Sequence, residues 1–174
     1  MNYAKIRKLD VTNGEGIGVS LFVQGCHFHC KNCFNKITWD FDSGNPFTKD
    51  TLDTIISLLN DKCIKRFSVL GGEPLAEKNI HDVLHTIIEI RKSVTNIIIW
   101  VYTGYTFEEV KQLKYGKEIL DNVDTIVDGR YIDELRDLTL EFRGSSNQNI
   151  WKKINNVWVN TTDSLIPMGK PVGL

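Results

Sequence analysis

The chain alternates short apolar runs, rich in β-branched residues, with stretches whose apolar residues recur at helical spacing. Four runs have the composition of buried strands: residues 19–24, 67–70, 96–102 and 125–127. Three stretches have the spacing of amphipathic helices: residues 48–62, 80–88 and 106–113. This order predicts an α/β fold with a mainly parallel sheet and right-handed crossovers.

Two further features refine this fold. Residues 96–102 are β-branched and aromatic throughout, which is typical of a strand covered on both faces, so we expect this strand to be central. Residues 151–160 resemble a hairpin that turns at Asn155 and Asn156. The sheet is therefore expected to end in a C-terminal β-hairpin.

Four motifs that are polar or contain glycine follow the four expected strands. In chain order they are a cysteine-rich loop at residues 26–33, then residues 71–74 (Gly-Gly-Glu-Pro), 102–105 (Tyr-Thr-Gly-Tyr) and 128–131 (Asp-Gly-Arg-Tyr). Ligands of parallel sheets bind at the carboxyl ends of the strands. We therefore expect the four motifs to share one rim and to form a single site.

The first motif holds Cys26, Cys30 and Cys33 within eight residues, and no fourth cysteine stands nearby. A structural zinc site or an electron-transfer cluster normally takes four protein ligands. An iron-sulfur cube held by three thiolates keeps one iron free to bind a small molecule. The cysteine loop therefore predicts a 4Fe-4S cluster with an open iron, ligated by these three cysteines.

A zinc site with three cysteines and one further ligand is the alternative. His27 and His29 lie inside the cysteine loop, where they are poorly placed to complete a tetrahedron around one ion. Cys63 falls near the end of an expected helix, where a lone cysteine is usually a small buried apolar residue. A zinc-binding interaction module, or an electron-transfer protein that uses Cys63, stays open as an alternative.

Length and composition limit the remaining possibilities. The 174 residues, 41% of them hydrophobic, suffice for one substantial core, and we expect a single domain over residues 1–174. The net charge of -1 and the lack of a long basic block argue against nucleic acid as a partner. No apolar stretch has the form of a secretory signal or the length of a membrane span, so we expect a cytoplasmic protein with reduced thiols.

The spacing of Cys26, Cys30 and Cys33 resembles the cluster loop of the radical S-adenosylmethionine superfamily. The resemblance implies that the open iron chelates the amino and carboxylate groups of S-adenosylmethionine, and that reductive cleavage of this cofactor gives a 5'-deoxyadenosyl radical. It also implies a partial (βα) barrel built on the mainly parallel sheet. Because the chain is short for a complete barrel, we expect a bulky partner to complete the site.

The same resemblance assigns roles around the rim. Residues 71–74 resemble the element that receives the cofactor's methionine ammonium group, where glycines permit a close backbone approach. Thr103 and Asp128 are candidates for its ribose or carboxylate, although turn roles are equally open. Phe34 is a candidate for packing on the adenine; in many members the aromatic residue directly precedes the third cysteine, where this chain has Asn32. The expected cofactor-binding residues are Gly71, Gly72, Glu73, Pro74, Asn32, Phe34, Thr103 and Asp128.

Within the superfamily, the chain resembles the activating proteins of anaerobic ribonucleoside-triphosphate reductases. The matching segments are residues 13–16, 20–26, 33–39, 71–74, 102–105 and 128–131. Glu15 and Gly18 stand where related activases often have proline and arginine. Residues 143–148 (Arg-Gly-Ser-Ser-Asn-Gln) also resemble a late segment of these proteins, and a polar turn is an equally open interpretation.

This resemblance implies that the radical abstracts a hydrogen atom from a glycine of the large reductase subunit, which then stores a glycyl radical. It also implies a separate low-potential electron donor such as flavodoxin, because the chain has no evident flavin or nicotinamide motif. Two other enzymatic functions stay open: activation of a different glycyl-radical enzyme, and a small-molecule reaction such as that of the carboxy-deazaguanine synthases.

Overall fold

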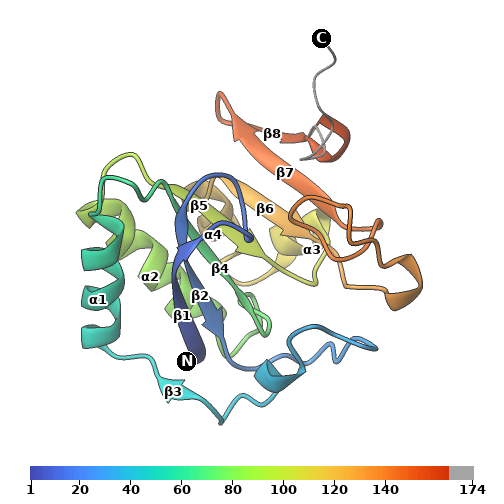
Figure 1. Cartoon of the computed structure of the whole chain (residues 1–174), viewed down its shortest axis with the longest axis horizontal. Helices are drawn as coiled ribbons and strands as arrows, with labels where there is room; N and C mark the ends of the chain where they lie inside the picture. The colour runs from blue at the N-terminus through green and yellow to red at the C-terminus, as the bar shows by residue number, and fades with distance from the viewer. Residues whose placement is uncertain (165–174) are drawn as a thin grey trace.

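An eight-stranded mixed sheet organises the chain in the computed structural model, which describes residues 1–164 (Figure 1). The strand order across the sheet is β3-β1-β2-β4-β5-β6-β7-β8. The strands are β1 (Asn2–Asp10), β2 (Gly18–Val23), β3 (Asn45–Pro46), β4 (Arg66–Gly71), β5 (Ile98–Tyr102), β6 (Thr125–Asp128), β7 (Asn149–Ile154) and β8 (Val157–Asn160). The mixed α/β architecture expected from the sequence is confirmed.

The parallel part of the sheet occupies its middle. Strands β2, β4, β5 and β6 are parallel neighbours, and antiparallel strands flank them on both sides. Strand β5, predicted to be central, lies inside this parallel group. The predicted hairpin is formed by β7 and β8, and its turn residues Asn155 and Asn156 have the positive φ angles, 50° and 61°, that such a turn favours.

Four α-helices connect the strands: α1 (Lys49–Leu59), α2 (Ile80–Ser93), α3 (Phe107–Gln112) and α4 (Gly116–Asn122). Three short 3-10 turns accompany them: η1 (Lys36–Thr38), η2 (Asp133–Leu135) and η3 (Thr162–Ser164). Capping boxes fix two of the helix starts, because Thr48 and Thr106 each accept a hydrogen bond from the backbone three residues later. Helices α1, α2 and α3 match the predicted stretches, whereas α4 was not predicted.

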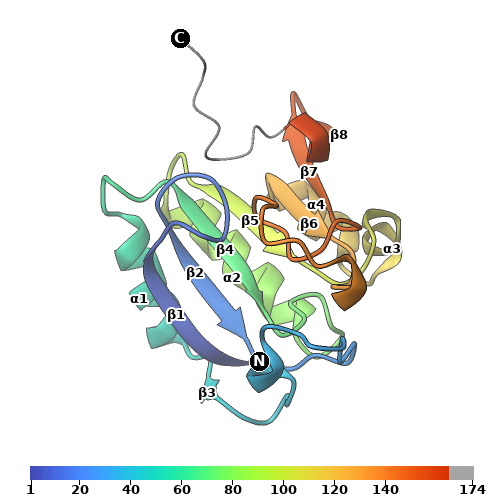
Figure 2. The same ribbon diagram turned by 45° about the vertical axis from the view of Figure 1, so that its right-hand side comes forward.

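The helices cover one face of the sheet. In Figures 1 and 2, α1 and α2 lie on the same side of the sheet. Ile55 of α1 and Ile87 of α2 are fully buried in one apolar cluster with Val69 of β4 and Ile99 of β5. Burial of these side chains supplies the main driving force for folding. The ends of the strands lie outside this cluster and are covered by loops.

The opposite face carries a smaller cluster. Side chains alternate between the two faces of a strand, so Trp100 of β5 points away from the helices and packs with Val127 and Ile150. Tyr102 and Phe142 pack against this cluster. This face therefore positions aromatic side chains near the carboxyl end of β5.

The edges of the sheet differ from expectation. Strand β1 was not predicted, because its alternating residues are mostly polar and half-exposed. In residues 1–164 the sheet is open, with β3 and β8 as its edge strands, so the partial barrel implied by the resemblance is not confirmed. Within the same residues, no helix is both long enough and apolar enough to cross a lipid bilayer.

Candidate functional site

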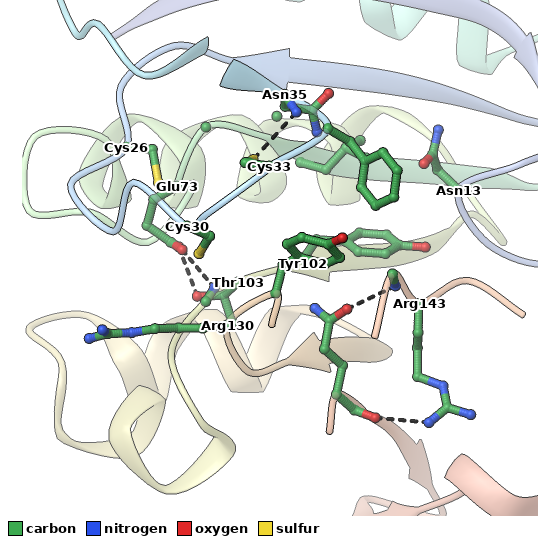
Figure 3. A pocket seen from close by; sticks show the side chains of 18 of the residues that line it. Asn13, Cys26, Cys30, Cys33, Asn35, Glu73, Tyr102, Thr103, Arg130 and Arg143 are labelled. Carbon is green, nitrogen blue, oxygen red and sulfur yellow. Dashed lines mark hydrogen bonds between the residues drawn. The ribbon is translucent and has the colours of Figure 1, made fainter. Parts of the chain in front are cut away.

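A cavity of about 470 Å³ opens at the carboxyl ends of the parallel strands (Figure 3). Each of the four motifs lines it: the cysteine loop after β2, Gly72 after β4, Gly104 after β5 and Arg130 after β6. The prediction that these motifs share one site is therefore confirmed.

The thiols of Cys26, Cys30 and Cys33 are free, half-buried and in the wall of this cavity. The loop between them turns sharply, with φ angles of 47° at His29 and 53° at Asn32. Burial raises the pKa of the Cys26 thiol to about 11, and burial also raises the pKa of Cys30. Both thiols are thus protonated at neutral pH, and a metal that binds them must displace these protons.

The donor set fits a cluster with three protein ligands. The rings of the two loop histidines are engaged elsewhere: His27 packs on Phe28 and Tyr105, and His29 stacks on Trp39. No group of three or more histidine, cysteine or acidic side chains in residues 1–164 is arranged to hold a single metal ion. In a four-iron cube each thiolate binds a different iron, so three free thiols around one cavity suit such a cluster.

The remaining cysteine does not belong to this site. Cys63 follows α1 in a turn in which its backbone N–H donates to the carboxylate of Asp61. It is exposed and does not line the cavity. The expectation that Cys63 is a buried apolar residue was wrong, because α1 ends before it and leaves the thiol in solvent.

Glu73 joins the motif after β4 to the motif after β5. Its Oε1 accepts hydrogen bonds from the backbone N–H of Leu75 (2.9 Å) and from the hydroxyl of Thr103 (2.7 Å), and its Oε2 accepts one from Gly104 (2.7 Å). Only 1% of Glu73 is exposed, and this burial raises its pKa to about 7 despite the three hydrogen bonds. A cation beside it would favour the ionised carboxylate.

The Gly-Gly-Glu turn packs directly on the start of the cysteine loop. The backbone N–H of Glu73 donates to the carbonyl oxygen of Gly25 at 2.7 Å. A Cβ atom on Gly72 would lie 2.4 Å from that same oxygen, which no side chain tolerates. The glycine at position 72 is therefore required to bring the two motifs together.

Side chains from beyond β6 hold the cysteine loop at both ends. The guanidinium carbon of Arg130 lies 4.3 Å from the centroid of the Phe28 ring, a cation–π contact. Further along the loop, Lys31 pairs with Glu134 at 2.5 Å, and Asn32 donates to Asp133 at 2.6 Å. The sequence analysis missed these contacts, since nothing in the residue types relates the loop to η2.

The other predicted cofactor residues divide between the cavity and its surroundings. Phe34 lines the cavity and packs edge-to-face on Tyr131 with ring centroids 5.1 Å apart. Thr103 also lines it. Pro74 and Asn32 are outside the cavity wall.

Asp128 has a structural role in the protein without its cofactor. Its buried carboxylate accepts hydrogen bonds from the backbone N–H groups of Phe107 (2.6 Å) and Asn149 (3.1 Å) and from the Asn149 side chain (3.0 Å). It does not line the cavity. This side chain ties the start of α3 to β7, and its contact with the cofactor stays a prediction.

The loop between β1 and β2 closes the far side of the cavity and is held by a buried arginine. Arg66 of β4 is fully buried and donates to the carbonyl oxygens of Asp10 (2.6 Å), Asn13 (2.5 Å) and Glu15 (3.2 Å). A Cβ atom on Gly18 would lie 2.8 Å from the Arg66 guanidinium carbon. Gly18 thus leaves the space that Arg66 fills. The sequence does carry a signal for the buried role of Arg66, because this charged residue stands next to an apolar run, but the role was not predicted from it.

Comparison with known proteins agrees with this site. A family model described as "4Fe-4S single cluster domain" matches residues 12–151. The chain is 42% identical to the anaerobic ribonucleoside-triphosphate reductase-activating protein of Escherichia coli K12 over 150 residues, which cover 85% of this chain and 96% of the relative. The proteins of the same name from Enterobacteria phage T4 and Vibrio cholerae are 37% and 40% identical.

These two relatives align over similar lengths. The phage protein matches 91% of this chain and 98% of its own length, and the Vibrio cholerae protein matches 86% and 97%. The region that the family model matches, residues 12–151, includes the cysteine loop. The chain therefore belongs to the family of anaerobic ribonucleoside-triphosphate reductase-activating proteins.

Proposed function

We propose that this protein activates an anaerobic ribonucleoside-triphosphate reductase by removing a hydrogen atom from the α-carbon of a glycine, which leaves a glycyl radical on the reductase. The observation that carries the proposal is the shared cavity, in which three free thiols meet the Gly-Gly-Glu turn in a chain of this family. A glycine radical is stabilised by its flanking amide nitrogen and carbonyl groups. The missing side chain also lets a glycine enter a narrow cavity.

Cys26, Cys30 and Cys33 would hold a 4Fe-4S cluster as its three protein ligands. When bound together with S-adenosylmethionine, this cluster supplies the reductive cleavage that produces a hydrogen-abstracting radical. We assign the supply of the electron to flavodoxin or a similar low-potential protein, because the sequence has no evident flavin or nicotinamide motif. The large reductase subunit is the protein substrate.

In this proposal the turn after β4 receives the methionine ammonium group of S-adenosylmethionine. Gly71 and Gly72 present backbone without a side chain that would block the ligand, and Pro74 fixes the exit of the turn. The Glu73 carboxylate, whose pKa is raised by burial, would be held ionised by the arriving cation. Thr103 keeps that carboxylate oriented through its hydrogen bond of 2.7 Å.

Aromatic and amide side chains of the cysteine loop have the remaining roles. Phe34 is 55% exposed and lines the cavity, so we assign it to the adenine of the cofactor. Asn32 acts indirectly, since its hydrogen bond to Asp133 anchors the loop that carries Cys33.

The proposal extends to the whole chain. We infer that the open sheet, with its helices on one face, is a partial (βα) barrel that the reductase completes on binding. Residues 1–174 would form one activase domain. A cytoplasmic location follows from the need for reduced thiols.

The test is anaerobic incubation of the iron-sulfur-reconstituted protein with the reductase, S-adenosylmethionine and reduced flavodoxin. A glycyl radical cleaves the backbone at its own glycine on exposure to oxygen, so mass spectrometry is expected to find the reductase cut at one glycine. Methionine and 5'-deoxyadenosine are expected as cofactor products.

Two results would contradict the proposal. Cleavage of S-adenosylmethionine with an intact reductase would indicate a small-molecule reaction or a different glycyl-radical partner. A colourless protein that contains one zinc after anaerobic purification would indicate a zinc-binding module.

A further inference from the structure

The segment after β6 contacts the cysteine loop on both sides of Cys33. On one side, the side-chain amide of Asn32 donates to Oδ2 of Asp133 at 2.6 Å. On the other side, the ring of Phe34 packs edge-to-face on Tyr131, with ring centroids 5.1 Å apart. The contact between Asn32 and Asp133 joins residues that are 101 positions apart in the chain. The position of Cys33 therefore depends on a segment outside its own loop.

Asn32 lies in the turn between Cys30 and Cys33, and its backbone has a left-handed φ of 53°. This conformation is unfavourable for residues other than glycine, although asparagine tolerates it better than most. The backbone N–H of Cys33 donates to the carbonyl oxygen of Cys30 at 3.1 Å and closes the turn. The turn sets the separation of two thiols that must each bind a different iron of one cube. Contacts that hold Asn32 in place thus favour the cluster-binding conformation of the loop.

Asp133 accepts hydrogen bonds with both of its carboxylate oxygens. Besides the bond from Asn32 to Oδ2, its Oδ1 accepts one from the hydroxyl of Tyr131 at 2.8 Å. These hydrogen bonds lower the pKa of Asp133, so the carboxylate is ionised at neutral pH. Hydrogen bonds to an ionised acceptor are stronger than those between neutral groups. The next residue, Glu134, forms an ion pair with Lys31 at 2.5 Å, so two neighbouring residues of η2 hold two neighbouring residues of the cysteine loop.

Residues 143–148, whose role the sequence left open, hold η2 in place. The hydroxyl of Ser145 accepts a hydrogen bond from the backbone N–H of Ile132 at 3.2 Å, and Ser145 is fully buried. The backbone N–H of Ser146 donates to the carbonyl oxygen of Leu135 at 2.9 Å. In the chain, these two contacts flank the pair of η2 residues that hold the cysteine loop. A continuous set of contacts therefore runs from residues 143–148 through η2 to the cluster ligands.

We propose that Asp133 is a positioning residue for the iron-sulfur cluster. Through Asn32 it holds the turn that carries Cys33 in the conformation that the cluster needs, and Ser145 supports the segment to which Asp133 belongs. This inference rests on the cysteine ligands of the proposed function and requires nothing of the reductase. It gives residues 143–148 the role of stabilising the cluster site without touching it.

The test measures how fast the protein, reconstituted with iron and sulfide under anaerobic conditions, releases iron to a ferrous-iron chelator. Asn32→Asp replaces the hydrogen bond by two carboxylates that face each other, and aspartate tolerates a left-handed backbone as asparagine does. This variant is expected to release iron about fivefold faster than wild type. The urea midpoint of the cluster-free protein is expected to stay at the wild-type value, because Asn32 is exposed.

The double variant Asn32→Asp with Asp133→Asn tests for rescue. It exchanges donor and acceptor: the amide introduced at position 133 can donate to the carboxylate introduced at position 32, and its oxygen can still accept from Tyr131. We expect the double variant to release iron at close to the wild-type rate. Recovery by this exchange would assign the effect to the hydrogen bond itself and not to the loss of the native side chain.

Two further variants complete the comparison. Ser145→Ala removes the acceptor of the Ile132 N–H and is expected to speed iron release about threefold. Asp53→Asn breaks an exposed ion pair with Lys49 on α1 and is the matched control, for which the wild-type rate is expected.

The inference is overturned if Asn32→Asp releases iron as slowly as wild type does, or if the double variant releases it as fast as Asn32→Asp. A wild-type rate in Ser145→Ala would overturn the supporting role of residues 143–148. Failure of the proposed function has a different signature: the wild-type protein itself would assemble no 4Fe-4S cluster, which would overturn both.

Discussion

At the residue scale, the four cysteines of the chain stand in two environments. Three line one cavity, whereas Cys63 is exposed in a turn outside it. We predict that Cys30→Ser abolishes the iron content of the reconstituted protein, and that Cys63→Ser, the matched control, keeps it at the wild-type level. Iron and sulfide assays after anaerobic reconstitution measure both. Loss of iron in Cys63→Ser would show that the ligand set is wrongly assigned.

The hydroxyl of Thr103 orients the Glu73 carboxylate through one hydrogen bond. Its hydrogen bond to the buried Glu73 is lost in Thr103→Val, which is expected to lower the free energy of unfolding by about 1–2 kcal/mol. We also expect the affinity for S-adenosylmethionine to fall about fivefold, because the carboxylate is no longer oriented. Urea denaturation and calorimetry check the two effects.

Thr103→Ser provides the control for this variant. Serine keeps the hydroxyl, so it is expected to recover most of the stability and most of the affinity. If valine and serine behave alike, the hydrogen bond to Glu73 does not orient the site.

The residue types of the cysteine loop and of the Gly-Gly-Glu turn are sufficient to predict that they meet in one cavity. They are not sufficient to predict the backbone contacts of Asp128 or the exposure of Cys63. The carboxylate of a buried aspartate can bind a ligand or neighbouring backbone N–H groups, and residue type alone does not show that Phe107 and Asn149 lie within its reach. The exposure of Cys63 depends on where α1 ends, which is the least certain part of any helix read from a sequence.

At the scale of elements, the loop from β1 to β2 depends on Arg66. Replacing it by methionine would leave the carbonyl groups of Asp10, Asn13 and Glu15 without their donor. We predict that Arg66→Met lowers the free energy of unfolding by about 3 kcal/mol, measured by urea denaturation.

The neighbouring Lys65 gives the control, because its side chain is exposed. Lys65→Met is expected to change the free energy of unfolding by less than about 0.5 kcal/mol. Equal effects of the two substitutions would contradict an anchoring role for Arg66.

Asp10, at the start of the same loop, is expected to make the free energy of unfolding depend on pH. Burial of Asp10 acts to raise its pKa, but hydrogen bonds from Thr12 and Asn13 outweigh this effect and lower the pKa to about 2 from 3.8. A carboxylate with a depressed pKa in the folded state stabilises the protein above its unfolded pKa and loses that contribution as the pH falls through its folded pKa. The stabilisation by Asp10 is therefore expected to disappear between about pH 4 and about pH 2.

Asp10→Asn is expected to remove this part of the pH dependence. Near neutral pH it should be less stable than wild type by on the order of 1 kcal/mol after allowance for solvent screening, and the difference should shrink as the pH falls. Urea denaturation at several pH values measures it. A difference that stays constant down to the acid limit would contradict the assignment.

Elements with strong periodicity were predictable and the others were not. Strands β2, β4 and β6 and the middle of β5 are buried, so their apolar runs are visible in the sequence. Strand β1 is half-exposed near the edge of the sheet, and α4 is only seven residues long. Neither carries enough apolar residues to produce a clear period.

At the scale of the whole molecule, the mixed architecture follows from the order of strands and helices, but the closure of the sheet does not. Closure depends on strand tilt and on what covers the edges β3 and β8, which local sequence does not encode. The sheet places its helices on one face and gathers the four motifs at one rim. A large protein substrate can thus approach the rim without displacing the core.

The central claim is that three thiolates leave one iron open for S-adenosylmethionine. Electron paramagnetic resonance of the anaerobically reconstituted and reduced protein, recorded with and without S-adenosylmethionine, tests it most directly. We predict a reduced 4Fe-4S signal whose shape changes when S-adenosylmethionine is added. A signal identical in both samples would mean that the cluster is fully ligated by the protein, and it would contradict the account.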